Sequence, residues 1–407
     1  IDHRLAVMRD DWTGLRPMTG YERPMILTTV RWFAAARLAH ALTEAGFSVS
    51  ACRPRRHPIK LVDGLASDHV LNRFSRRGSL TRAIRRAQPD IILPDDEPSL
   101  VLLRRLHRKL RKTDPVTAEL IAGSLGDVGY WPVIASRAAL ATQARGLGIA
   151  APATEVVATE AAVKAWVADE SFPVVLKTDG SWGGRGVTVV REASQLGRAW
   201  RATSGPPSLP RAVKRLVFNL EAGPLAAWLR RARPVVNVQQ FVPGREAIVT
   251  VACLEGSVLG LVCLEVVAAT AERGPAATVR IIDHPAMQEA ARQLVARFRL
   301  SGFCGFDFII TDTGEARLLE LNPRVTPTAH LLVEGDPPVG RTLTLFPAVN
   351  STAPEPGSSA TGVLDVPVRA PALIQHGQRR TARQRRPVVR LVRQTRRRLT
   401  DAYRADR

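Results

Sequence analysis

Short apolar runs alternate with helical patterns in the first third of the chain. Residues 25–28 are apolar, an alanine-rich stretch with helical spacing follows, and Gly46 is placed as its C-cap before a second apolar run at residues 47–51. Residues 89–94 form a third run that leads into an acidic turn and another helix. Strands alternating with helices predict a parallel sheet covered by helices, so residues 1–130 are predicted to form an α/β domain.

Longer strand patterns follow after residue 131. A helix is predicted from Ser136, strands at residues 234–242, 246–255 and 257–267, and a helix at residues 285–298. These elements predict a second domain over residues 131–345, in which residues 193–234 form a mostly helical insert. Residues 346–365 are rich in Pro, Ser, Gly and Ala, which is typical of a disordered linker.

Charge separates the end of the chain from its body. The 407 residues carry a net charge of +21, and the stretch from Arg369 onward has thirteen arginines against two aspartates. The arginine-rich tail, residues 366–407, has one narrow apolar helical stripe, so it could dock on the body, stay disordered, contact an anionic surface or, least favoured, bind nucleic acid. We expect an accessory role and no stable nucleic-acid partner.

Four isolated cysteines, without a C-x-x-C pair, are typical of a reducing compartment. There is no run of 18 apolar residues and no signal-peptide pattern, so a cytoplasmic protein is predicted. The chain begins with Ile1 instead of Met, and whether a few leading residues are missing is left open.

A glycine-rich stretch carries one of only six lysines. In FPVVLKTDGSWGGRGVTVV, residues 172–190, Lys177 ends an apolar strand and a β-branched strand follows Gly186. The P-loop and the Rossmann fingerprint both open a helix, so this loop is neither. A glycine hairpin can close over phosphates through its backbone N–H groups, with Lys177 reaching them. The alternative is a plain turn beside a surface lysine.

An acidic hairpin is the stronger signal. In FDFIITDTGEARLLELN, residues 306–322, a two-residue turn at Thr313 and Gly314 would pair Asp307 with Glu320, and Asn322 would share their face. Like charges opposite each other repel, and a divalent cation between them removes that cost. Two carboxylates and an amide suit Mg²⁺. The alternative is an exposed hairpin with charged outer positions.

Together, the lysine strand, the glycine hairpin and the Asp…Glu-x-Asn set resemble the ATP-grasp superfamily over about residues 130–330. The resemblance implies an ATP-grasp fold preceded by a Rossmann-like parallel-sheet domain, a mobile lid at about residues 165–242, and the cofactors ATP and Mg²⁺, with Mn²⁺ as an alternative ion. The segment between Cys263 and Pro285 lacks the bicarbonate and biotin motif of biotin carboxylases, so we do not expect that activity.

The resemblance also implies residue roles. Lys177 and Arg324 would be catalytic, by offsetting charge on the transferred phosphoryl group. Arg137 stands where relatives usually have lysine and keeps the charge. The implied ATP-binding residues are Arg137, Lys177, Gly183, Gly184, Gly186, Gln239, Val242 and Glu246, and the implied metal ligands are Asp307, Glu320 and Asn322.

The implied activity joins a carboxylate, activated as an acylphosphate, to an amine. Asp95 and Asp96, at the carboxyl end of a predicted strand, could hold the amine or cap the next helix, and His330 could touch substrate or be structural. A regulatory ATP-binding module is the alternative function. The carboxylate and amine are not identified by the sequence, and homo-oligomer formation is left open.

Overall fold

The computed structural model describes residues 15–18, 20–170, 172–180, 186–205, 234–270, 276–334 and 339–344. The chain divides into a unit over Ile1–Val363 and a second over Leu364–Arg407. The second unit, most of the 193–234 insert and the predicted linker lie outside the described residues. Within the described part of the chain, no helix is both long and apolar enough to cross a bilayer.

The first domain is built on a parallel sheet, as predicted. Its strands are β1 (Pro24–Leu27), β2 (Ser50–Arg53), β3 (Ser67–Val70) and β4 (Ile91–Pro94), in the order β3-β2-β1-β4. Helix α1 (Phe33–Glu44) packs on one face, and helices α2 (Arg76–Ala87), α3 (Glu97–Leu110) and α4 (Pro115–Leu125) pack on the other. The carboxyl ends of the four strands therefore share one edge of the sheet.

The end of α1 and the start of β2 differ slightly from the bounds predicted from the sequence. Helix α1 ends at Glu44, and Gly46 takes a positive φ of 93° that suits glycine. The amide of Phe47 donates to the carbonyl of Leu42, so the helix turn continues there and β2 begins only at Ser50. The predicted second strand was placed three residues too early because the apolar side chain of Phe47 packs on the core without joining the sheet.

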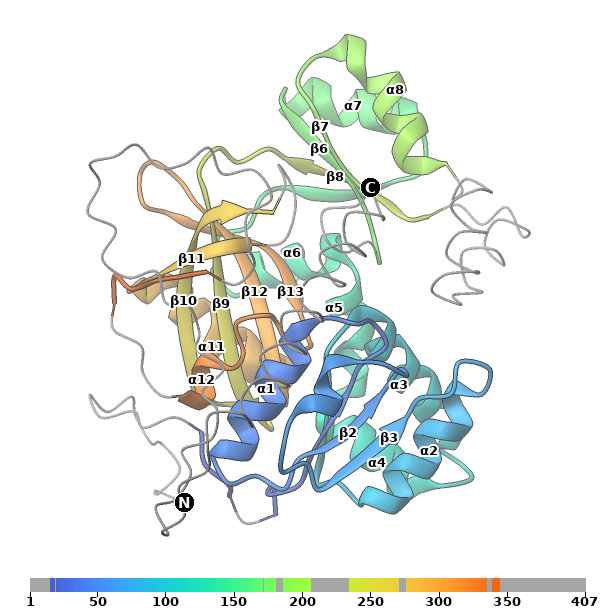
Figure 1. Cartoon of the computed structure of the whole chain (residues 1–407). Helices are drawn as coiled ribbons and strands as arrows, with labels where there is room; N and C mark the ends of the chain where they lie inside the picture. Colours follow the sequence, from blue (N-terminus) through green and yellow to red (C-terminus); the bar gives the residue numbers. More distant parts are fainter. Residues whose placement is uncertain are drawn as a thin grey trace. The chain divides into compact units, whose positions relative to one another are not determined.

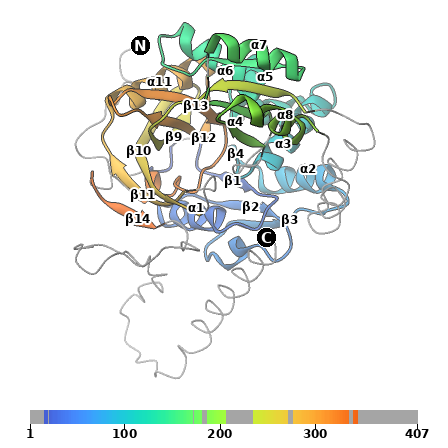
Figure 2. The ribbon, with the colours of Figure 1, turned by 90° about the horizontal axis from the view of Figure 1, so that it is seen from above.

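The second domain contains a six-stranded sheet in the order β13-β12-β9-β10-β11-β14. Helix α11 (Pro285–Phe298), found at the predicted residues, packs on one face together with α6 (Arg137–Gly146). Helices α1 and α12 (Leu331–Glu334) pack on the other face, so α1 contacts both sheets (Figures 1 and 2). The strands are β9 (Arg245–Leu254), β10 (Ser257–Ala269), β11 (Ala276–Ile282), β12 (Gly302–Ile310), β13 (Ala316–Asn322) and β14 (Thr342–Thr344).

A separate four-stranded sheet, here termed the lid, lies in the region predicted to be a mobile lid, and its mobility stays a prediction. Its order is β5-β8-β6-β7, and helices α7 (Glu160–Glu170) and α8 (Ala193–Ser204) cover one face. Strand β5 begins at Thr154, before the lid boundary near residue 165 that the sequence indicated, because it pairs with β8. The strands are β5 (Thr154–Val157), β6 (Val174–Thr178), β7 (Val187–Val190) and β8 (Val236–Gln240).

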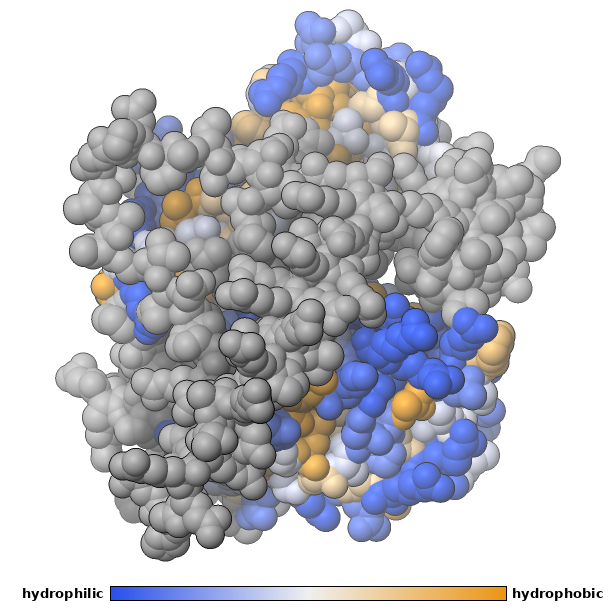
Figure 3. All heavy atoms as spheres, viewed as in Figure 1, coloured by the Kyte–Doolittle hydropathy of each residue, from blue (hydrophilic) through white to orange (hydrophobic). Residues whose placement is uncertain are grey.

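The surface seen in Figure 3 is hydrophilic over the helices of the first domain, with isolated hydrophobic side chains. Helix α2 has the sequence RRGSLTRAIRRA, and its buried residues include Leu80, Ala83 and Ile84. The arginines cover the outside of the helix, so the body is basic at its surface while its core is apolar.

Candidate active site

Asp307 pairs with Glu320 in the acidic hairpin, as predicted, but the turn that joins the two strands differs from the predicted one. The turn between β12 and β13 spans residues 311–315, where the Thr311 amide donates to the Glu315 carbonyl, and is therefore longer than two residues. A bulge in the ladder follows: Phe308 pairs with Leu318, whereas Asp307 pairs with Glu320. The extra residue, Leu319, restores the register that the longer turn would have shifted.

The side chains of Asp307, Glu320 and Asn322, the predicted metal ligands, lie close together on the hairpin. The Asn322 amide donates to a carboxylate oxygen of Asp307 at 3.0 Å. Burial and then the charge of Glu320 raise the pKa of Asp307 to about 7. Among the described residues no group of three or more His, Cys, Asp and Glu side chains could enclose a metal. Two carboxylates and an amide fit Mg²⁺, which keeps water and phosphate oxygens as its other ligands.

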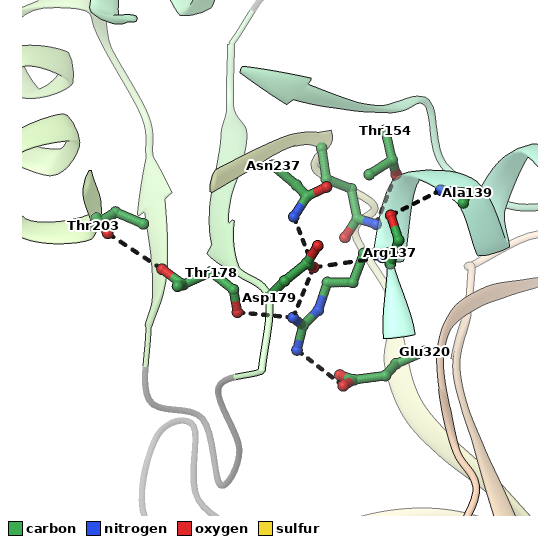
Figure 4. A network of polar contacts seen from close by, with 10 residues as sticks. Arg137, Ala139, Thr154, Thr178, Asp179, Thr203, Asn237 and Glu320 are labelled. Carbon is green, nitrogen blue, oxygen red and sulfur yellow. Dashed lines mark hydrogen bonds and ion pairs between the residues drawn. The ribbon is translucent and has the colours of Figure 1, made fainter. Parts of the chain in front are cut away.

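Arg137 links this hairpin to the lid (Figure 4). It is the first residue of α6, whose N-cap is Ser136, and its side chain is 8% exposed. One guanidinium nitrogen donates to Glu320 at 2.9 Å and another to the Thr178 carbonyl at 2.8 Å. An arginine in place of lysine can bridge in this way because its fork carries several donors in one plane.

Lys177 lies at the end of β6, opposite Val187 on β7 and Asn237 on β8. It is 8% exposed, and no acidic group of the described residues lies within ion-pair distance of its ammonium nitrogen. Burial lowers the pKa of Lys177 to about 8, although the charge of Glu320 acts in the other direction. A desolvated lysine without an ion-pair partner, close to carboxylates, is suited to bind an anion such as phosphate.

The glycine loop is described only at its ends. The Thr178 amide donates to the carbonyl of Gly186, whose φ is +73°, so the two strands close as a hairpin as predicted. Gly183 and Gly184 lie outside the described residues, and their role as a phosphate cover stays a prediction.

Two polar residues that the sequence reasoning missed complete the network at Arg137. Asp179 accepts from the Asn237 amide at 2.9 Å and forms an ion pair with Arg137 at 3.4 Å. Asn237 is fully buried. Its signal in the sequence is its spacing: in VVNVQQ it alternates with valines and shares a strand face with Gln239, so both polar side chains point away from the valine core.

The predicted adenine segment follows β8. The side chain of Gln239 is buried and donates to Thr154 at 2.9 Å, and its backbone lies within the sheet between β5 and β6, so a direct contact of Gln239 with a base stays a prediction. Val242 is buried and Glu246 is exposed near the start of β9. Gly244 has a φ of +150°, and a Cβ there would lie 2.3 Å from the Ile310 carbonyl oxygen. The loop between lid and central sheet therefore requires glycine at this position.

Arg324 follows the hairpin and faces the first domain. Its guanidinium donates to the side-chain oxygen of Asn322 at 3.1 Å and lies 3.9 Å from a carboxylate oxygen of Glu97. The amide of Val325 donates to the carbonyl of Pro94 at 2.8 Å. The end of β4 is thus held beside the acidic hairpin, and Arg324 is near both.

The two aspartates after β4 have different surroundings. Asp96 caps α3 by accepting from the amide of Ser99 in a capping box, so the structure favours the capping interpretation for this residue. Asp95 is 5% exposed, and neither of its carboxylate oxygens has a hydrogen-bond partner among the described residues. Burial and then the charge of Asp96 raise the pKa of Asp95 to about 7.

His330 has the surroundings of a structural residue. It is 8% exposed, and its Nδ1 lies 3.1 Å from the carbonyl oxygen of Pro327. Burial, followed by the charge of Arg37, lowers the pKa of His330 to about 4, so the ring is neutral at pH 7. A neutral buried imidazole just before α12 favours the structural interpretation over substrate contact.

Comparisons with known proteins agree with this architecture. Residues 226–328 match the family model of the ATP-grasp domain. No curated protein matches the sequence. The chain is similar to the structure of N5-carboxyaminoimidazole synthase from Aspergillus clavatus in complex with ADP and 5-aminoimidazole ribonucleotide, at 16% identity and a TM-score of 0.56, covering 81% of this chain and 76% of that one.

Two further structures show the same fold. N5-carboxyaminoimidazole synthetase from Staphylococcus aureus complexed with ADP is 13% identical with a TM-score of 0.54, and 82% of each chain is covered. Biotin carboxylase from Campylobacter jejuni is 15% identical with a TM-score of 0.53, covering 77% of this chain and 71% of that one. The chain has the ATP-grasp fold, and the predicted resemblance to the ATP-grasp superfamily is confirmed.

Proposed function

We propose that this protein is an ATP- and Mg²⁺-dependent ligase that activates a substrate carboxylate as an acylphosphate for attack by an amine. One observation carries the proposal. Three segments far apart in the sequence bring Arg137, Lys177 and the Asp307–Glu320 pair to one place. Two cations and two carboxylates of this kind are what the phosphates of ATP and a magnesium ion require.

The proposed reaction has two steps, phosphoryl transfer to the carboxylate and attack of the amine on the acylphosphate. A carboxylate oxygen of the substrate attacks the γ-phosphorus of ATP, the bond from that phosphorus to the bridging oxygen breaks, and ADP leaves. The amine nitrogen then attacks the acyl carbon, releases phosphate and loses a proton. Asp307, Glu320 and Asn322 would hold Mg²⁺, which supplies charge neutralisation on the phosphates when bound.

The chain's own residues would bind and orient the reactants. Lys177, with its low exposure and no ion-pair partner among the described residues, would donate to phosphate oxygens. Arg324, beside Asn322, would offset charge on the transferred phosphoryl group or the bound carboxylate. The buried Gln239 side chain braces β8 against β5, so the adenine would meet the following backbone and Val242.

The names of similar structures support this chemistry as a class. They include synthetases crystallised with ADP and, in one case, with 5-aminoimidazole ribonucleotide, and carboxylases crystallised with nucleotides. The segment between Cys263 and Pro285 forms parts of β10 and β11 and lacks the biotin carboxylase motif, which favours a different carboxylate. Four buried free cysteines fit a reducing cytoplasm, where we expect the reaction to take place.

The test is ADP release from Mg-ATP in the presence of pooled carboxylates and amines. Glu320→Gln and Asp307→Asn should each abolish it, because removing a metal ligand costs several kcal/mol, on the order of 3, of charge stabilisation. Glu315→Gln is the matched control, since Glu315 lies in the same hairpin, is exposed and pairs with Arg317. If wild type bound ATP without releasing ADP in any pool, a regulatory ATP-binding module would replace the ligase.

A further inference from the structure

The carboxylate of Asp95 is a buried acidic group beside the proposed site, close enough to Arg324 for their charges to interact. Asp95 directly follows β4, and its amide donates to the carbonyl of Leu27 at 2.9 Å, so the parallel ladder fixes its backbone. Its two side-chain oxygens are buried, and no described residue donates to either with hydrogen-bond geometry, although the nearby Thr28 hydroxyl acts to lower the pKa of Asp95. A buried acceptor without a donor costs about 1–3 kcal/mol, and a ligand that donates to it would remove this cost.

The neighbouring Asp96, in contrast, has hydrogen-bond donors to both of its carboxylate oxygens. Its oxygens accept from the amides of Thr29, Val30 and Ser99 and from the hydroxyls of Thr28 and Thr29. Those donors connect the end of β1 with the start of α3. The Thr28 hydroxyl, which donates to Asp96, also lies close enough to Asp95 to act on its pKa. The hydrogen bonds that join β1 to α3 are nevertheless those of Asp96.

The place of Asp95 connects it with the proposed chemistry. Val325 is hydrogen-bonded to Pro94, and this contact sets Asp95 beside the segment that carries Arg324. The charge of Arg324 acts on Asp95, and Arg324 also lies 3.9 Å from Glu97. Asp95 is as enclosed as Lys177, with exposed fractions of 5% and 8%, so its low exposure is typical of the groups in this site.

We propose that Asp95 is the subsite for the amine, and that it binds the N–H donors of a cosubstrate carrying a primary amino group. A carboxylate whose two oxygens have no donor accepts two N–H bonds, and no group of three or more His, Cys, Asp and Glu side chains among the described residues could hold a metal ion there. The inference rests on the proposed ligase function. It assigns the nucleophile to the end of β4 and the phosphoryl chemistry to the metal hairpin.

Binding can be tested without knowing the cosubstrate. At pH 8, where the carboxyl of Asp95 is ionised, we expect methylammonium chloride to raise the unfolding midpoint of the full-length protein more than tetramethylammonium chloride at the same ionic strength, because only methylammonium carries N–H donors. Asp95→Asn should remove this difference. Asp90→Asn, at the other end of β4 and paired with Arg23, should keep it. Equal responses of wild type to both salts would overturn the proposal.

The second test is catalytic and separates failure of this inference from failure of the proposed function. ADP release is measured with Mg-ATP, pooled carboxylates, and a panel of amino acids and polyamines against their N-acetylated forms. Asp95→Asn should lower kcat/KM for a stimulating amine by about 10- to 150-fold, a much larger loss than that of amine-independent ADP release. ADP release by wild type that no amine raises, or an amine response that Asp95→Asn keeps, refutes the amine subsite.

A merely structural Asp95 would behave differently in the same assays. If Asp95 only supports Arg324, Asp95→Asn would lower amine-independent ADP release and the unfolding midpoint together. That outcome also overturns the proposal. Absence of Mg-ATP turnover in wild type, combined with a methylammonium response that depends on Asp95, would instead reject the ligase function and retain the amine site.

Discussion

Replacing Asp95 by asparagine should stabilise the protein above pH 7 and have little effect at low pH. Burial and then the charge of Asp96 raise the pKa of Asp95 to about 7, whereas Arg324 acts in the other direction. In the unfolded chain the same carboxyl has a pKa of about 3.9. Between these two values the unfolded carboxyl is ionised and the native one is protonated. Wild type therefore loses stability as pH rises from about 4 to about 7.

The size of this effect follows from the difference of about 3 pH units between the two pKa values. At ~1.36 kcal/mol per unit the ionisation of Asp95 costs about 4 kcal/mol, and relaxation around the ionised group lowers this to about 2–4 kcal/mol. An asparagine is neutral at every pH and carries no such cost. Relative to wild type, Asp95→Asn should thus gain about 2–4 kcal/mol in the free energy of unfolding between pH 4.5 and pH 8.

Urea unfolding of both proteins at half-unit pH steps gives this difference directly, because other titrating groups cancel. Asp90→Asn, directly before β4, is the control. Burial raises the pKa of Asp90, but its hydrogen bonds from Arg23 outweigh this and lower it overall, so removing that charge should destabilise the protein. An Asp95→Asn protein that is less stable than wild type at pH 8, or a difference that does not change with pH, would contradict the reasoning.

Three further predictions concern other parts of the chain. Lys177→Ala should weaken ATP binding in calorimetry by about 10-fold or more, whereas Lys164→Ala, which loses only an exposed pair with Glu160, should not; equal effects would exclude the phosphate role. Gly244→Ala should lower the free energy of unfolding in urea by about 1–3 kcal/mol, because its Cβ meets the Ile310 carbonyl, while Gly123→Ala in open space should not destabilise α4. Deleting residues 366–407 should keep ADP release within a few-fold and reduce salt-sensitive binding to anionic vesicles; loss of turnover in the folded protein would place the tail in the active site.

Much of the fold could be predicted because local patterns agree with it. The helix at residues 285–298 was predicted at its actual bounds, since proline stands at its start and its apolar spacing faces one sheet. The Asp307–Glu320 pairing was also right, although the two-residue turn assumed for it was wrong. The alternation of polar and apolar residues correctly predicted that Asp307 and Glu320 share a face of the hairpin. In the structure a longer turn and a bulge together place them there.

The site's contacts could not be predicted, because they join segments that are distant in the sequence. Arg137 was recognised as a cation in the usual lysine position, but its bridge between Glu320 and the Thr178 carbonyl depends on how α6 meets both the hairpin and the lid. The acidic pair after β4 was left open between capping and binding. The structure decides for Asp96, which accepts the capping hydrogen bond from Ser99. The oxygens of Asp95 have no such bond among the described residues, which leaves Asp95 as the candidate for binding.

The bulge in the acidic hairpin separates the tip of the hairpin from its base. The exposed tip at residues 312–314 can change in sequence, or accept inserted residues, while the ladder from Asp307 to the central sheet keeps its register with β9. Loss of one residue at Leu319 has the opposite consequence, since Glu320 would then turn to the other face and leave Asp307. Substitutions and insertions at the tip should therefore be tolerated during evolution, whereas a deletion at Leu319 should not be.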